Sequence, residues 1–121
     1  MKKIILTAAA TALTLGFATS AQANKAMSTE ELVSYCSSGN SDTFVTCEIY
    51  GQAVYDTYLV YSQHRKSPKF ICVKQPAAPR KEVIQKYVEW ANANPKFAKD
   101  PAADTILRFL GGRFPCGKAG K

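Results

Sequence analysis

The sequence predicts a small all-α domain of four helices that is stapled by two disulfides. Three observations lead to this prediction. Apolar residues recur at steps of three and four in four segments, which is the period of a helix. Four cysteines stand in a short chain, and an even count in a small exported protein is typical of a disulfide framework. The first residues have the three regions of a secretory signal peptide.

The predicted signal peptide covers residues 1–23. It begins with Lys2 and Lys3, continues as an apolar run, and ends in the small-x-small pattern Ala21-Gln22-Ala23. The apolar run is short for a membrane span, so we expect cleavage and no span in the mature protein; the alternative is an uncleaved anchor. An exported, disulfide-bonded chain of this kind is expected in the periplasm of a Gram-negative cell.

The mature part, residues 24–121, is predicted to be one small domain. Its core stabilises it only modestly, so covalent staples are expected. Its formal charge is +5, because the full-chain charge of +7 includes Lys2 and Lys3. This mild positive charge suits an acidic partner surface. The basic residues are scattered rather than clustered in a stripe, so nucleic acid is not an expected partner.

The first two helices are predicted at residues 28–37 and 43–61. Ser28 and Glu31 form a capping box at the start of the first helix. Asp42 is the expected N-cap of the second, whose apolar face includes Gly51. At Gly51 and Ala53 the missing or small side chain would let another backbone approach closely.

The last two helices are predicted at residues 79–94 and 101–110. An irregular connection, residues 62–78, precedes them and includes a short extended piece at Cys72. Asp100 is the expected N-cap of the fourth helix, and Gly111-Gly112 is expected to end it.

Four cysteines allow three disulfide pairings, and the sequence alone does not decide among them. The order of the helices favours one pattern. A short turn would bring Cys36 and Cys47 together, and an antiparallel hairpin of the last two helices would bring Cys72 to Cys116.

No constellation in the sequence indicates an enzyme, a metal site or a cofactor site. His64 is the only histidine and reads as a surface residue without a catalytic partner. Most carboxylates fall at helix N-termini, where capping explains them. Asp56 lies inside an apolar helix, where we expect it to hydrogen-bond a helix end or a tyrosine. Several aromatic residues favour a core with polar rims, or else a protein interface: Tyr50, Tyr55, Tyr58, Tyr61, Tyr87 and Trp90.

Five motifs follow one another along the chain, namely "LVSYC", "CEIYGQAVYD", "FIC", "YVEWANANP" and the closing "FPC". This ordered set resembles the Rap/Tai family of type VI secretion immunity proteins. Two positions depart from the family pattern, Ile49 and Ala53, where the family often has glycine. Gly111 and Gly112 replace more helical residues.

The resemblance implies a periplasmic, helical protein, often a homodimer, that binds a toxin delivered by sister cells. In the best-understood branch the toxin is a peptidoglycan amidase, and the immunity protein occludes its cleft without performing chemistry. From charge and expected exposure, we predict partner contacts at Gln63, His64, Arg65, Lys66, Arg80 and Lys81. The alternative functions are an acid-stress chaperone of the periplasm and an inhibitor of a foreign lysozyme-type hydrolase.

Overall fold

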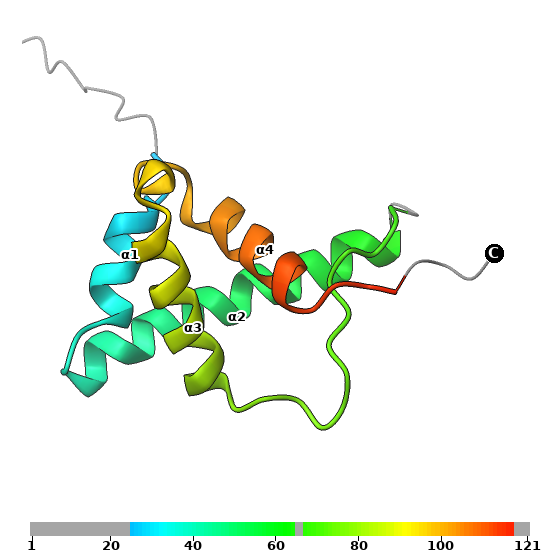
Figure 1. The fold of residues 1–121 in the computed structure, drawn as a ribbon, viewed down its shortest axis with the longest axis horizontal. Coiled ribbons are helices and arrows are strands. Elements are labelled where there is room, and N and C mark those ends of the chain that lie inside the picture. The colour runs from blue at the N-terminus through cyan, green and yellow to red at the C-terminus, as the bar shows by residue number, and fades with distance from the viewer. Residues whose placement is uncertain (1–24, 65–66, 118–121) are drawn as a thin grey trace, which may run out of the picture.

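The computed structural model describes residues 25–64 and 67–117. Within these residues there are four α-helices, one short 3-10 helix and no strands, which confirms the predicted all-α class (Figure 1). The elements are α1 (Thr29–Cys36), α2 (Ser41–His64), α3 (Arg80–Ala93), η1 (Pro95–Phe97) and α4 (Ala102–Arg113). The predicted signal peptide lies outside the described residues. None of the helices described is long and apolar enough to cross a membrane.

Two predicted N-caps were wrong. Asn40 caps α2, because its side-chain oxygen accepts hydrogen bonds from the backbone N–H groups of Asp42 at 2.9 Å and Thr43 at 3.1 Å. Asn40 thus occupies the position that Asp42 was expected to take. Asp100 does not cap α4, whose N-cap position is Pro101 and has no side-chain cap. The Asp100 carbonyl instead accepts a hydrogen bond from the Thr29 N–H at 2.9 Å and ties the start of α1 to the start of α4.

The predicted end of the fourth helix was also wrong, because α4 runs through Gly111 and Gly112 to Arg113. Packing explains the first glycine. A Cβ at Gly111 would lie 3.0 Å from the ring of Phe70, so this position accommodates a neighbouring side chain and does not end the helix.

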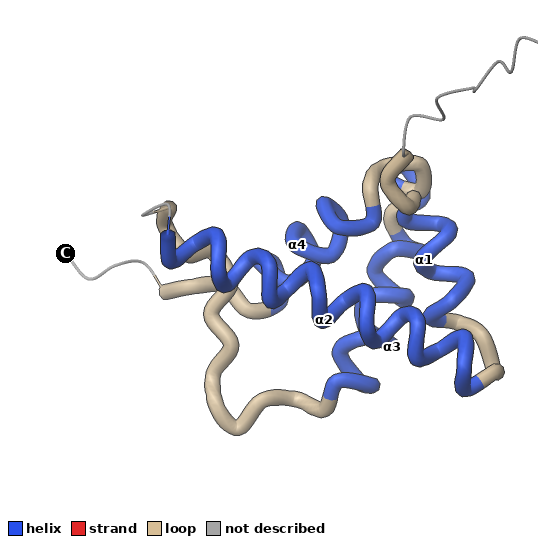
Figure 2. Tube along the Cα trace, turned by 180° about the vertical axis from the view of Figure 1, so that it is seen from behind, coloured by secondary structure: helices blue, strands red, loops and turns tan. Residues whose placement is uncertain are grey.

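The core lies where α1, α3 and α4 meet the first half of α2 (Figure 1). The buried core residues are Leu32, Cys36, Cys47, Tyr87, Ala102, Ile106 and Phe109. The second half of α2 extends past this core, as seen from behind in Figure 2. The helices α3 and α4 meet at η1 and diverge from it (Figure 1). The connection that precedes α3 runs from beside the end of α4 to the start of α3.

Both disulfides have the favoured pairing. Cys36 and Cys47 join the end of α1 to α2 with a Cα–Cα distance of 5.1 Å. Cys72 and Cys116 join the connection to the segment after α4 with a Cα–Cα distance of 4.9 Å. The short turn between α1 and α2 brings the first pair of sulfur atoms together as expected. The expected antiparallel hairpin of the last two helices was wrong, because α3 and α4 diverge from η1 (Figure 1), and the return of the chain after α4 brings Cys116 to Cys72 instead.

Candidate functional site

An apolar groove of about 320 Å³ lies between α2, α3 and α4 and is the candidate site. Its volume is at the small end of the range for ligand cavities, and it is partly open to solvent. The groove exists because α2 and α3 have little direct contact: both pack mainly on α1, and α4 packs on each of them. Most of the side chains that line it are apolar.

One face of α2 forms the first wall of the groove. Cys47, Gly51 and Tyr55 follow one another at steps of four residues, which places them in a row along one side of a helix. Gly51 stands in the middle of this row, and a Cβ built there would meet no atom within 4 Å. The expectation that another backbone approaches Gly51 was therefore wrong, because the groove occupies that space.

The other walls come from α3, α4 and the connection before α3. Val83, Ile84 and Tyr87 recur at helical spacing on α3 and turn toward the core, and α4 contributes in the same way. The α4 residues are Ile106, Phe109 and Leu110. Val73, Ala77 and Ala78 of the connection close the remaining border. The groove is thus an uncovered extension of the hydrophobic core.

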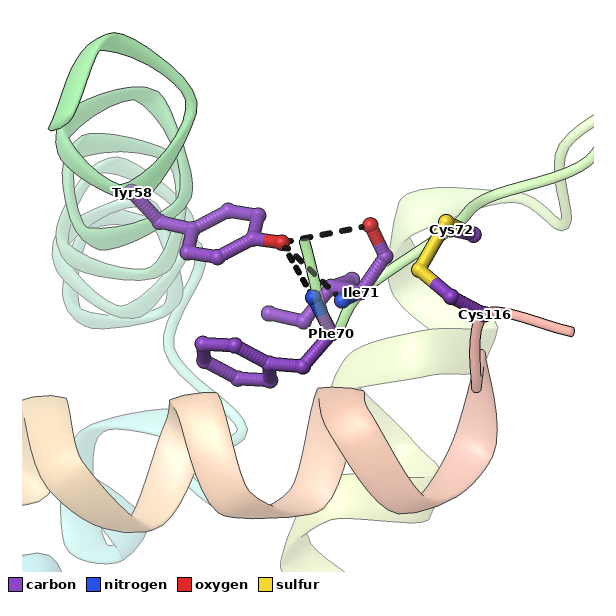
Figure 3. The surroundings of a disulfide bond; sticks show 5 residues. All are labelled: Tyr58, Phe70, Ile71, Cys72 and Cys116. Carbon is purple, nitrogen blue, oxygen red and sulfur yellow. Dashed lines mark hydrogen bonds between the residues drawn. A yellow bond between two sulfur atoms is a disulfide. The ribbon is translucent and has the colours of Figure 1, made fainter. Parts of the chain in front are cut away.

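A cluster that we term the C-terminal latch fixes the start of the connection (Figure 3). It consists of Tyr58, Phe70, Ile71, Cys72 and Cys116. The N–H groups of Phe70 and Ile71 each donate to the buried Tyr58 hydroxyl at 3.0 Å, and this hydroxyl donates to the Ile71 carbonyl at 3.4 Å. The disulfide follows immediately along the chain. The latch therefore anchors one border of the groove to α2 and to the end of α4.

Backbone pairing reinforces the latch. Ile71 forms an isolated antiparallel bridge with Pro115, and the Cys72 N–H donates to the Phe114 carbonyl at 2.8 Å. The short extended piece predicted at Cys72 therefore pairs with the chain that leaves α4. Phe114 itself lines the groove.

The model of the Rap1a immunity protein family matches residues 28–116. The chain belongs to this family. The match begins at the N-cap of α1 and ends at the last cysteine, so it spans both disulfides and every helix. Comparisons with curated proteins and with solved structures found no match. Membership indicates an immunity protein against a secreted effector, and the two disulfides fit an exported member of the Rap1a family.

The rim of the groove in this family member contains a short polar chain. Arg80 donates from Nη2 to Gln52 Oε1 at 2.7 Å, and Gln52 donates from Nε2 to Asp56 Oδ1 at 2.7 Å. The first bond joins the start of α3 to α2 across the groove. Asp56 is exposed and bonds this glutamine, so the expectation that it bonds a helix end or a tyrosine was wrong.

The border of the groove at residues 73–81 is cationic. It contains Lys74, Arg80 and Lys81, of which Arg80 lines the groove, and the next carboxylate along the chain, Glu82, pairs with Arg113 at 3.5 Å. All three side chains belong to exposed residues, and none of them has a carboxylate partner among the described residues. The α2 wall differs, because it carries Glu48 on the groove and Asp56 beside it.

The structure does not bring all the predicted contact residues together. Gln63 and His64 are exposed at the end of α2, whereas Arg80 and Lys81 stand at the start of α3. These two helix ends lie well apart in Figure 1. Arg65 and Lys66 lie outside the described residues. Of the predicted residues, Arg80 is the one that lines the groove.

The tyrosines have different roles. Tyr87 is buried and bonds the Thr105 hydroxyl at 2.9 Å, which in turn bonds the Thr29 hydroxyl at 2.8 Å. Burial raises the pKa of the Tyr87 phenol, although the hydrogen bonds with threonine oppose this shift. Tyr58 belongs to the latch, Tyr55 lines the groove, and Tyr61 is exposed.

The described residues contain no group of histidine, cysteine and carboxylate side chains that could hold a metal. All four cysteines are in disulfides, so none is available as a nucleophile. What this surface offers is shape, apolar area and charge, which are the means of binding.

Sequence reasoning missed the groove. The usable signal was Gly51, a glycine within the apolar face of a long helix, where it lowers helix propensity by about 1 kcal/mol relative to alanine. A glycine at such a position indicates either that another group packs closely against the helix or that the helix borders an open space.

Proposed function

We propose that this protein acts in the periplasm as an immunity protein that neutralises a type VI secretion amidase effector by covering its active-site cleft. The observation that carries the proposal is the family match across residues 28–116. The protein itself would perform no chemistry. Protection would extend to the cell that makes the toxin and to its sister cells.

Rigidity supports a mechanism of steric occlusion. A surface that is ordered before it binds loses less conformational entropy on docking, which favours tight binding. Here the Cys36–Cys47 disulfide joins the end of α1 to α2, and the C-terminal latch fixes the start of the connection and the segment after α4. The predicted signal peptide, residues 1–23, would deliver the mature domain, residues 24–121, to the compartment where peptidoglycan is cleaved.

The predicted contacts at residues 63–66, Arg80 and Lys81 belong to the same proposal. Arg80 and Lys81 are exposed, and positive side chains of this kind favour an acidic partner and raise its rate of association. A homodimer is also part of the proposal. Apolar side chains exposed along α2, namely Val45, Ile49 and Val60, support a contact between two copies.

Co-expression tests the function directly. Papain-like amidase effectors from the genome that encodes this chain would be targeted to the periplasm of a test strain, with and without the full-length protein. We expect the full-length protein to restore growth against one of them. A variant that lacks residues 2–23 should stay in the cytoplasm and fail to protect, and an effector without its catalytic cysteine should be harmless in every strain.

A second measurement separates the alternatives. The purified mature domain should inhibit peptidoglycan cleavage by that effector with a fixed stoichiometry. If the domain inhibits lysozyme and none of the amidases, the result would support the alternative function as an inhibitor of a foreign lysozyme-type hydrolase. Suppression of protein aggregation at acid pH, without inhibition of any amidase, would support the chaperone. Either result would contradict the proposed function.

A further inference from the structure

We propose that the groove between α2 and α3 is the docking site for the effector, and that it receives an apolar side chain that stands next to a carboxylate on the effector surface. This inference rests on the proposed function and adds the site and the chemistry of the contact.

The groove contains apolar surface that the described chain leaves uncovered. Space for a side chain exists at Gly51, where a Cβ would meet nothing within 4 Å. Tyr55 of α2 and Ile84 of α3 line the same groove. Anchor residues of protein interfaces characteristically fill such apolar pockets, and a few of them supply most of the binding energy.

The charges around the groove indicate on which side the effector carboxylate would bind. Arg80 lines the groove at the start of α3, with Lys74 and Lys81 in the same exposed segment, whereas the α2 wall carries Glu48 and has Asp56 beside it. An effector carboxylate is therefore favoured near Arg80 and disfavoured near Glu48. The Arg80 guanidinium already donates to the Gln52 amide, which orients it at the rim of the groove.

The same charges disfavour two other occupants. A second copy of this chain also carries a formal charge of +5 in its mature form, so we place the proposed homodimer on the exposed apolar side chains of α2, Val45, Ile49 and Val60, and not on the groove beside Arg80. An anionic amphiphile lying along the groove would pass the Glu48 carboxylate, which repels it. A partly open groove also suits a side chain that enters from a protein surface.

Filling the groove is the first test. Gly51→Leu places a side chain into the open space, and Gly112→Leu is the matched control. Gly112 is also a helical glycine without a neighbour within 4 Å, and it does not line the groove. The dissociation constant of each variant would be measured by calorimetry with the catalytically inactive amidase effector that the wild-type protein binds. We expect Gly51→Leu to weaken binding about 30-fold or more, as for the loss of an interface anchor.

Reversing the charge of Arg80 is the second test and is independent of groove filling. Arg80→Glu should weaken binding by about 10-fold or more and reduce the dependence of the association rate on salt. Lys96→Glu makes the same change of charge in η1, outside the groove, and should change binding much less. Circular dichroism spectra and thermal transitions of all four variants establish that each is folded.

The outcomes separate this inference from the proposed function. If the wild-type protein binds the effector and both Gly51→Leu and Arg80→Glu bind it equally well, the groove is not the docking site, although the function stands. If Gly51→Leu proves unfolded, Arg80→Glu alone decides. If the wild-type protein binds no amidase effector, the function and the groove assignment both fail.

Discussion

Two neighbouring regions of this molecule differ in how completely their side chains are covered by the rest of the chain. The first, which we term the packed corner, consists of Thr29, Leu32, Tyr87, Ala102 and Thr105. All five residues are buried, and the hydroxyl groups of the corner bond one another. The second is the groove, where α2 and α3 leave an apolar surface uncovered. Leu32 and Tyr87 belong to both regions.

This contrast shows how a small domain can be both stable and able to bind. The packed corner contains no buried polar side-chain atom without a hydrogen bond, and the same is true of the other described residues. Closed packing of this kind resists change and holds the helices in place. The groove then offers a preformed surface whose apolar groups gain by contact with another molecule. Stability and recognition thus depend mainly on different residues, and Leu32 and Tyr87 are shared between the two regions.

The largest expected effect comes from removing the C-terminal latch disulfide. The double variant Cys72→Ser and Cys116→Ser should lower the free energy of unfolding by about 4 kcal/mol, because the bond closes a long loop, with a sequence separation of 44. Urea unfolding followed by circular dichroism measures this loss. We also expect weaker protection against the effector, since the border of the groove loses its anchor. A loss below about 1 kcal/mol would contradict the role assigned to the latch.

The packed corner should respond strongly to a change of a single atom. Thr105→Val keeps the shape of the side chain but removes the hydroxyl that bonds Tyr87, Thr29 and the Ala102 carbonyl. Buried partners lose their hydrogen bonds, so the free energy of unfolding should fall by about 1–3 kcal/mol. Thr57→Val is the control, because Thr57 is exposed on α2 and bonds only the Ala53 carbonyl. Equal stability of the two variants would contradict the description of the corner.

Two helical glycines sharpen the comparison further. Gly51→Ala should raise the free energy of unfolding by about 0.5–1 kcal/mol, because alanine favours the helix and its Cβ meets nothing within 4 Å. Gly111→Ala should gain less or lose stability, since its Cβ would lie 3.0 Å from the Phe70 ring. Thermal unfolding of both variants gives the comparison. A larger gain at Gly111 than at Gly51 would show that the groove is not open at α2.

The smallest effect is expected at alkaline pH. Burial raises the pKa of Tyr87 above the value of 10.0 that applies to an unperturbed tyrosine. The folded state therefore holds this proton more tightly than the unfolded state. The resulting stability is fully present below pH 10.0 and is lost as the pH rises through the folded pKa. Tyr87→Phe should lose less stability than the wild-type protein across this range, as measured by urea unfolding at several pH values.

The sequence was sufficient for the features that depend on local pattern and chain order. Helical periodicity located all four helices, and their order favoured both disulfides. The errors lie where two local signals compete. Asn40 and Asp42 are both good N-caps, and the structure uses the first. Gly111 is a typical helix terminator, yet it lies inside α4, where the Phe70 ring occupies the space beside its missing side chain.

The candidate site was harder to predict than the fold, because the groove lies where two helices do not pack against each other. Arg80 was singled out by its charge, and the structure places it on the groove. The open space at Gly51 could not be derived, since it depends on how α3 and α4 diverge from η1. Periodicity identifies which face of α2 is apolar, but it does not reveal whether another helix covers that face.

The most direct test of this account is a map of the surface that changes when the effector binds. Methyl and amide NMR spectra of the mature domain would be recorded during titration with the catalytically inactive amidase effector. We expect the largest shifts at groove residues such as Ala78, Ile84 and Gly51, and little change at Thr29 in the packed corner. Shifts confined to surfaces away from the groove, with Gly51 and Ile84 unaffected, would contradict the assignment of recognition to the groove.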